Sequence, residues 1–367
     1  VAVGRLTLQA FTGSNATAVG SGAADAAGSQ TNLTAVGRNA LGAATSGNSN
    51  TAVGANSLQT VDGTQNTAVG TDALNADCVS NNTAVGREAL YAFTGSDATA
   101  VGSGAADSAV GNAGITAVGR LALSAATSGD YNTAIGASSL ATVDGARNTA
   151  CGYGALSADC GSDNTAVGVN ALDSFTGIDA TAVGSSAAAA ATSAGGLVAI
   201  GKQALTNCTT GNQNTAVGSN SLKAGTTSIV GNVAVGYSAG RHTVGTYNVY
   251  VGNEAGYYAS GADHCVAVGR DALKGVSDST VGSCVKNGTT TITCGSSAVI
   301  AVGQYLTGTG IPNGAVVSTV NSAGSVTSFT ISIAATDSAT STLTFYKTTG
   351  DYNIAIGSYA LDATTTG

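Results

Sequence analysis

Carboxylates and imidazoles are the side chains of this chain that could carry out acid–base or metal chemistry. Paired carboxylates hydrolyse glycosidic bonds in many enzymes, and an enzyme of that kind needs one unique site. Here, however, most aspartates fall at repeated positions: Asp25 and Asp107, Asp62 and Asp144, and Asp77 and Asp159. The two histidines, His242 and His264, form no His-x-His pair, and no Cys-x-x-Cys motif is present. These patterns predict turn aspartates and loop histidines, and hence no enzyme, no metal site and no cofactor.

The seven cysteines do not form a pattern typical of a disulfide framework. Cys78 and Cys160 are copies of one repeated loop position, and Cys151 replaces a valine, which predicts a small buried apolar residue. Cys284 and Cys294 bracket nine residues that could form a hairpin. The sequence is compatible both with a disulfide across that hairpin and with two free thiols.

The element that must position all these residues is a short repeat. The triplet Ala-Val-Gly, or a close variant, recurs along most of the chain at nearly constant spacing. Its glycines are Gly4, Gly20, Gly37, Gly54, Gly70, Gly86, Gly102, Gly119, Gly136, Gly152, Gly168, Gly184, Gly201, Gly218, Gly236, Gly252, Gly269 and, after a gap, Gly357. So short a repeat predicts an all-β, parallel β-solenoid or β-roll with turns of about 16–18 residues.

The full repeat reads Asn-Thr-Ala-Val-Gly-x-x-Ala-Leu, with clean copies from Asn66, Asn82, Asn164 and Asn214. We expect two short strands and two corners in each turn, with asparagines that hydrogen-bond from turn to turn. Alternation places Thr and Val on one face of the strand and Ala and Gly on the other. The small face suits either the inside of a narrow roll or contact with sister chains. We expect Val at the centre of a packed strand, with Val118 facing the interior.

Threonine columns are also typical of ice-binding surfaces. One Thr per turn, an uneven period and a place beside Val in an expected core strand argue against that function. A longer repeat lies above the short one, because residues 11–25 return as 93–107 with only Asn15 changed, to Asp97. The shift from Phe11 to Phe93 equals five turns, and such growth lengthens a spacer readily.

Composition narrows the class further. The chain has 53 glycines, one proline, no Met and no Trp. Its net charge of −8 argues against nucleic-acid binding. No apolar run is long enough to cross a membrane, so we expect no membrane insertion. Both ends of the sequence fall inside repeats without a capping element, and we therefore expect a longer fibre.

The repeat is interrupted once. We expect a shaft over residues 1–275, a small antiparallel β-sandwich or β-barrel domain inserted at 276–347, and a resumed solenoid over 348–367. Strand-like runs cover 289–293, 315–320, 328–333 and 342–346. Within this non-repeating surface, Tyr305, Asn313 and Tyr346 could stack on and hydrogen-bond to a sugar.

These repeats resemble those of phage tail-fibre proteins and are similar to the head repeats of trimeric autotransporter adhesins. The stretch from Leu306 to Gly314 also looks like small β-modules of phage fibres. The resemblance implies a left-handed β-roll in a parallel homotrimer. It further implies a structural shaft of a phage tail or head fibre in the virion, with other fibre or virion proteins and a host-surface glycan or protein as partners. A bacterial surface adhesin and a non-viral extracellular filament protein are the alternatives.

Overall fold

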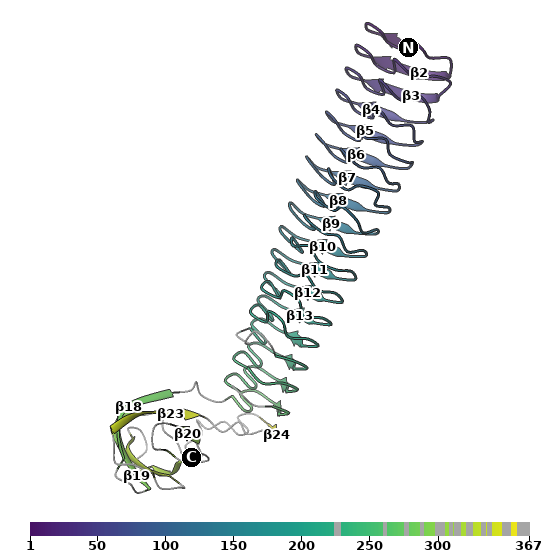
Figure 1. Cartoon of the computed structure of the whole chain (residues 1–367). Coiled ribbons are helices and arrows are strands. Elements are labelled where there is room, and N and C mark those ends of the chain that lie inside the picture. Colours follow the sequence, from purple (N-terminus) through teal and green to yellow (C-terminus); the bar gives the residue numbers. More distant parts are fainter. Residues whose placement is uncertain are drawn as a thin grey trace. The chain divides into compact units, whose positions relative to one another are not determined.

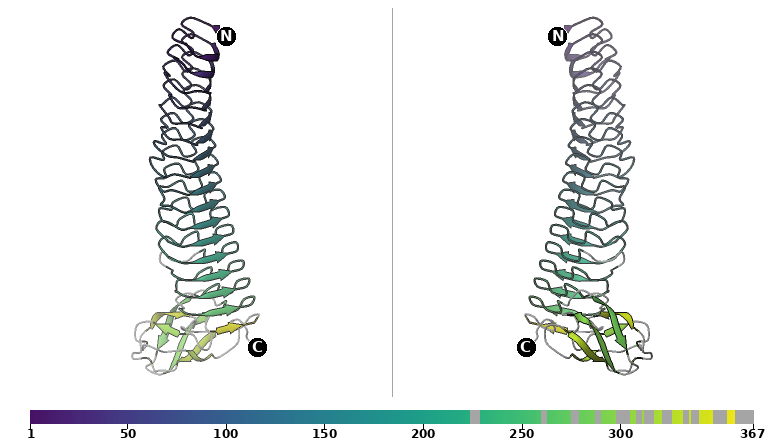
Figure 2. Two further views of the ribbon diagram at one scale, coloured as in Figure 1. Left: turned by 90° about the vertical axis from the view of Figure 1, so that its right-hand side faces the viewer. Right: turned by 90° about the vertical axis from the view of Figure 1, so that its left-hand side faces the viewer.

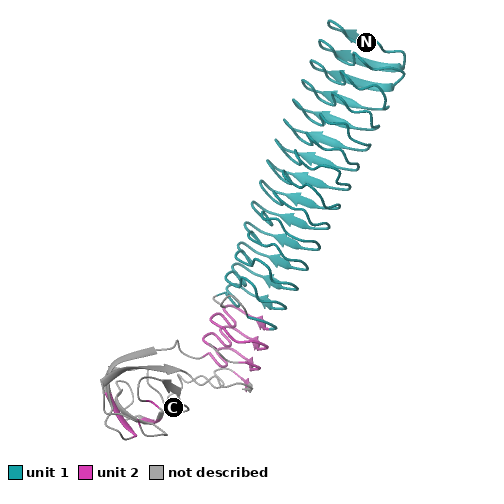
Figure 3. Ribbon diagram, in the orientation of Figure 1, with its two compact units in different colours: residues 1–231 teal, residues 232–367 magenta. Residues whose placement is uncertain are grey.

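The computed structural model describes residues 1–223, 229–259, 263–274, 279–286, 290–297, 305–307, 311, 317–320, 326–331, 335, 340–346 and 354–357. Strands and turns, without helices, make up these residues. The chain divides into two compact units, residues 1–231 and residues 232–367 (Figure 3).

Unit 1 is a parallel β-solenoid, as the repeat predicts. Each strand pairs in parallel with the strand of the next turn, so that Thr67 lies opposite Thr83 and Thr99 opposite Thr116 (Figures 1 and 2). Its strands are β1 (Ala2–Val3), β2 (Ser14–Val19), β3 (Thr31–Val36), β4 (Thr51–Val53), β5 (Thr67–Val69), β6 (Thr83–Val85), β7 (Thr99–Val101), β8 (Thr116–Val118), β9 (Thr133–Ile135), β10 (Thr149–Cys151), β11 (Thr165–Val167), β12 (Thr181–Val183), β13 (Val198–Ile200) and β14 (Thr215–Val217).

Each turn of unit 1 contributes one strand, so the expectation of two strands per turn is wrong. After the strand, the backbone enters left-handed conformations: Gly70 has φ 141°, Asp72 φ 56° and Leu74 φ 50°. A β-carbon at Gly70 would lie 2.4 Å from the carbonyl oxygen of Gly86 in the next turn, which explains the glycine. Left-handed residues cannot continue an extended ladder. The x-x-Ala-Leu segment therefore forms a tight corner that still turns Leu74 into the core, where it is fully buried.

The small face of the strand is the inside of the roll. Ala117 is 0% exposed and Val118 is 37% exposed, and the same division holds in the neighbouring turns. The expectation that Val118 faces a packed interior is therefore wrong. Alanine from the strand and leucine from the corner make up most of the buried core. Valine, on the opposite side of the pleat, is left on the surface.

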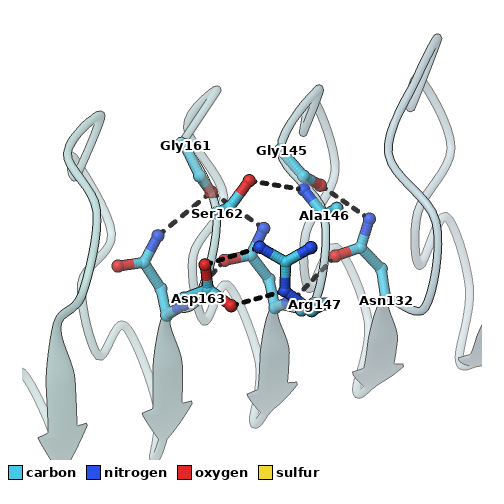
Figure 4. Close-up of polar contacts among 9 residues, drawn as sticks. Asn132, Gly145, Ala146, Arg147, Gly161, Ser162 and Asp163 are labelled. Atoms are coloured by element: carbon cyan, nitrogen blue, oxygen red, sulfur yellow. Dashed lines mark hydrogen bonds and ion pairs between the residues drawn. The ribbon is translucent and has the colours of Figure 1, made fainter.

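A column of buried asparagines links successive turns, as expected. The side-chain oxygen of Asn132 accepts a hydrogen bond from the backbone N–H of Asn148 at 2.8 Å. The side-chain oxygen of Asn148 likewise accepts one from the backbone N–H of Asn164 at 2.9 Å. The Asn132 side-chain amide also donates to the Gly145 carbonyl at 2.8 Å (Figure 4). Because these asparagines are fully buried, each bond satisfies a backbone group that water does not reach.

Unit 2 contains parallel strands of the same kind, β15 (Val233–Val235), β16 (Val249–Val251), β17 (Val266–Val268) and β24 (Ile354–Ile356). Strand β17 pairs in register with β24, with Val266 opposite Ile354, although the two strands are far apart in sequence. The Gly357 N–H donates to the Val268 carbonyl at 2.8 Å, so the ladder resumes after the interruption.

The segment between β17 and β24 contains a six-stranded antiparallel sheet in the order β20-β23-β18-β19-β22-β21. Its strands are β18 (Ser279–Lys286), β19 (Thr291–Ser297), β20 (Tyr305–Thr307), β21 (Val317–Val320), β22 (Val326–Ile331) and β23 (Thr340–Tyr346). Strands β19, β21, β22 and β23 overlap the four expected runs, whereas β18 and β20 fall outside them. A separate domain with boundaries at 276 and 347 stays a prediction.

The two faces of β8 can be distinguished by matched substitutions. Ala117→Leu adds volume inside the narrow roll, and we expect it to lower the free energy of unfolding by about 1–3 kcal/mol. Val118→Leu adds volume on the surface and should change it by no more than about 0.5 kcal/mol. Urea unfolding followed by circular dichroism measures both, and equal losses would contradict this assignment of the faces.

Candidate interaction surface

The repeated aspartates hold the corners together. The Asp62 carboxylate accepts hydrogen bonds from the backbone N–H groups of Thr45 at 2.7 Å and Ser46 at 2.8 Å. Its copy Asp144 accepts from the N–H of Thr127 at 3.2 Å. In turn, Asp77 accepts from the N–H of Asp62 at 3.0 Å. These aspartates are turn residues, as their spacing predicts, and each one spans two adjacent turns.

The two histidines lie against tyrosines of adjacent turns. The His242 ring stacks on Tyr258 with centroids 5.0 Å apart, and the exposed His264 stacks on Tyr247 at 5.4 Å. Burial, together with the neighbouring Arg241 charge, lowers the pKa of His242. Within the part of the chain that the structure describes, no three His, Cys, Asp or Glu side chains come together as metal ligands.

Two of the three candidate sugar-binding residues lie side by side in the antiparallel sheet. Tyr305 on β20 lies directly opposite Tyr346 on β23. Asn313 lies outside the described residues. Sugar binding by these three residues stays a prediction.

The hairpin expected between Cys284 and Cys294 is present, because β18 and β19 pair antiparallel with Val285 opposite Thr293. Whether the two sulfurs form a disulfide stays open, since their side chains are outside the described residues.

The most extensive uniform feature of unit 1 is the outer face of its strands, which we term the Thr/Val face. Its first column is Thr17, Thr34, Thr51, Thr67, Thr83, Thr99, Thr116, Thr133, Thr149, Thr165, Thr181, Val198 and Thr215. Its second column is Val19, Val36, Val53, Val69, Val85, Val101, Val118, Ile135, Cys151, Val167, Val183, Ile200 and Val217. From Val19 to Ile200, the valines and isoleucines of the second column are 36–44% exposed. Neither column contains a charged residue.

The outward position of the Thr/Val face corrects two expectations. The threonines do not face the core, so their position no longer argues against ice binding. The single Thr per turn and the uneven period still argue against that function. Cys151 lies in the second column and is half-buried, so the expectation that it is a core residue is also wrong. Strand alternation correctly grouped Thr with Val but could not show which group faces inward.

Comparison with known proteins gives no further assignment: no family model, no curated protein and no solved structure matches this chain. Among the described residues, no helix is long and apolar enough to cross a membrane.

Cysteine reactivity can report on the Thr/Val face. Burial raises the pKa of the Cys78 thiol to about 11 and that of the Cys160 thiol to about 12. At pH 8 both are therefore almost entirely thiols, and the thiolate is the reactive form. Mass spectrometry after brief iodoacetamide treatment of the folded single chain should find Cys151 modified before Cys78 and Cys160. Equal rates at the three positions would contradict the exposure of Cys151.

Proposed function

We propose that this chain is a structural fibre shaft whose solenoid associates laterally with further copies of itself through the Thr/Val face. The observation that carries the proposal is the uncharged Thr/Val face itself. Over the thirteen turns from β2 to β14, the spacing of parallel strands makes it about 60 Å long. Together with the exposed residues on either side of each strand, it is about 20 Å wide.

A surface of that size meets the requirement of a specific interface, which buries about 800 Å² on each partner. Monomeric proteins rarely expose continuous apolar patches of more than a few hundred Å². A second copy supplies the matching surface at every turn, because both copies repeat at the same spacing. A small-molecule substrate would use one place on the chain and leave the rest of the face without a role.

The finer assignment is a left-handed β-roll in a parallel homotrimer, forming the shaft of a phage tail or head fibre in the virion. Its support is the resemblance of the Asn-Thr-Ala-Val-Gly repeats to phage fibres and adhesin heads. The Ala/Gly face, which faces the interior, contributes nothing to this association. In this role the shaft is non-enzymatic and connects other fibre or virion proteins to a host surface.

The oligomeric mass tests the proposal. Sedimentation equilibrium at micromolar concentration should give three times the mass of one chain, and Cys151 should react with iodoacetamide more slowly in the assembly than in the dissociated chain. The double variant Val101→Asp, Val118→Asp should dissociate while keeping its circular dichroism spectrum, because both side chains lie on the surface. A wild-type monomer with fully reactive Cys151 would refute the proposed function.

The six-stranded sheet between β17 and β24 is the proposed site of host-surface recognition, because it interrupts an otherwise repeated surface. Removal of residues 276–346 would place Gly269 and Gly357 one ordinary turn apart in the sequence. We expect the shortened chain to keep the number of copies in its oligomer and to lose binding on a glycan array. Glycan binding by the shortened chain would show that this sheet is not required for recognition.

A further inference from the structure

Two columns of mostly exposed residues border the Thr/Val face. We define the N rim as the residues two positions before the first column: Asn15, Asn32, Ser49, Gln65, Asn81, Asp97, Gly114, Tyr131, Arg147, Asp163, Asp179, Gly196 and Gln213. The C rim comprises the residues two positions after the second column: Ser21, Arg38, Ala55, Thr71, Arg87, Ser103, Arg120, Ala137, Tyr153, Val169, Ser185, Lys202 and Ser219. Both rims lie next to the face along the chain, and most of their residues are exposed.

The two rims carry opposite charges. The C rim has four basic residues, Arg38, Arg87, Arg120 and Lys202, and no acidic one. The N rim has three acidic residues, Asp97, Asp163 and Asp179, and a single basic one, Arg147.

Arg147 belongs to an ion pair within the chain. Its Nε and Nη2 donate to the two Asp163 carboxylate oxygens at 2.6 and 2.7 Å (Figure 4). This pair holds the pKa of Asp163 below its usual value, mainly through the hydrogen bond. Among the described residues, the N-rim carboxylates outside any ion pair are therefore those of Asp179 and of Asp97, which accepts hydrogen bonds from Asn81 and Ser96. On the C rim, the Arg87 guanidinium also contacts the Glu88 carboxylate at 2.5 Å, whereas Arg120 and Lys202 are exposed.

The opposite charges lie within one turn of each other along the solenoid. Asp97 precedes β7, and Arg87 and Arg120 follow β6 and β8, one turn before and one turn after it. Asp179 precedes β12, and Lys202 follows β13, again one turn away. No basic residue of the C rim lies within one turn of Asp163, the aspartate that is already paired within its own chain.

Symmetry determines which rims meet when two copies join face to face. Rotation about an axis parallel to the solenoid keeps every residue at its own height and brings the N rim of one copy to the C rim of the next. Rotation about an axis along the strands reverses one solenoid and brings like rims together. The first arrangement places acidic residues beside basic ones, and the second places basic residues beside basic ones.

We propose that the rims determine the polarity and register of self-association: copies lie parallel and unshifted, with Asp179 beside Lys202 of the neighbour and Asp97 between the neighbour's Arg87 and Arg120. This inference rests on the proposed function, since it assumes association through the Thr/Val face. The apolar columns favour association in either direction, and the rims exclude the antiparallel one. The occupant of the face is therefore a second copy of this chain in a stated orientation.

A charge exchange tests the contact between Asp179 and Lys202. Asp179→Lys and Lys202→Asp should each weaken association about tenfold or more at low ionic strength, because every interface then contains a like-charged pair. The double variant, which has the net charge of the wild type, should restore association. All three effects should shrink in 0.5 M salt. A double variant that associates no better than the single ones would refute the proposed contact.

A second measurement tests polarity directly. In negative-stain electron micrographs of chains with a gold-labelled N-terminal tag, we expect all labels of one particle at the same end. Labels at both ends would overturn the parallel arrangement while leaving self-association intact. A wild-type chain that is monomeric would instead refute the proposed function itself, so the two failures are distinguishable.

Discussion

The close stacking of one turn's backbone on the next is the constraint on which this protein depends. At Gly119, a β-carbon would lie 2.6 Å from the Gly136 backbone, and similarly short distances recur along the glycine column. Glycine at each of these positions lets the strands pair in register, and the register aligns every other residue type into a column. The buried asparagines, the corner aspartates and the outer valines are all columns of this kind.

Stacking also explains why polar groups are tolerated in so narrow a core. Each turn buries a thin layer of side chains, mostly alanine and leucine with an occasional larger residue such as Phe93 or Phe175. Buried amides such as that of Asn148 bond to the backbone of the next turn, so they stabilise the stack instead of opposing burial. The core is thus continuous along the solenoid, although no single turn could fold alone.

A surface made of columns suits assembly better than catalysis. Every feature of the Thr/Val face recurs at nearly the same spacing, so a partner with the same period meets it at each turn. The exceptions are the rim charges, which vary from turn to turn and therefore carry positional information. In a repeated structure, such irregular positions are the ones that can define direction and register.

The sequence alone determined the solenoid, its period, the pairing of Thr with Val and the structural role of the aspartates, because these follow from spacing and alternation. Only the tertiary structure decided that alanine faces inward and Val118 and Cys151 face outward. Alternation alone allows either face of the strand to be buried, and only packing against the rest of the turn selects the alanine face. The number of strands per turn likewise depended on left-handed residues such as Leu74, whose conformation no propensity indicates. The pairing of β17 with β24, and of Tyr305 with Tyr346, joins segments that are distant in sequence, and only the folded ladder brings them together.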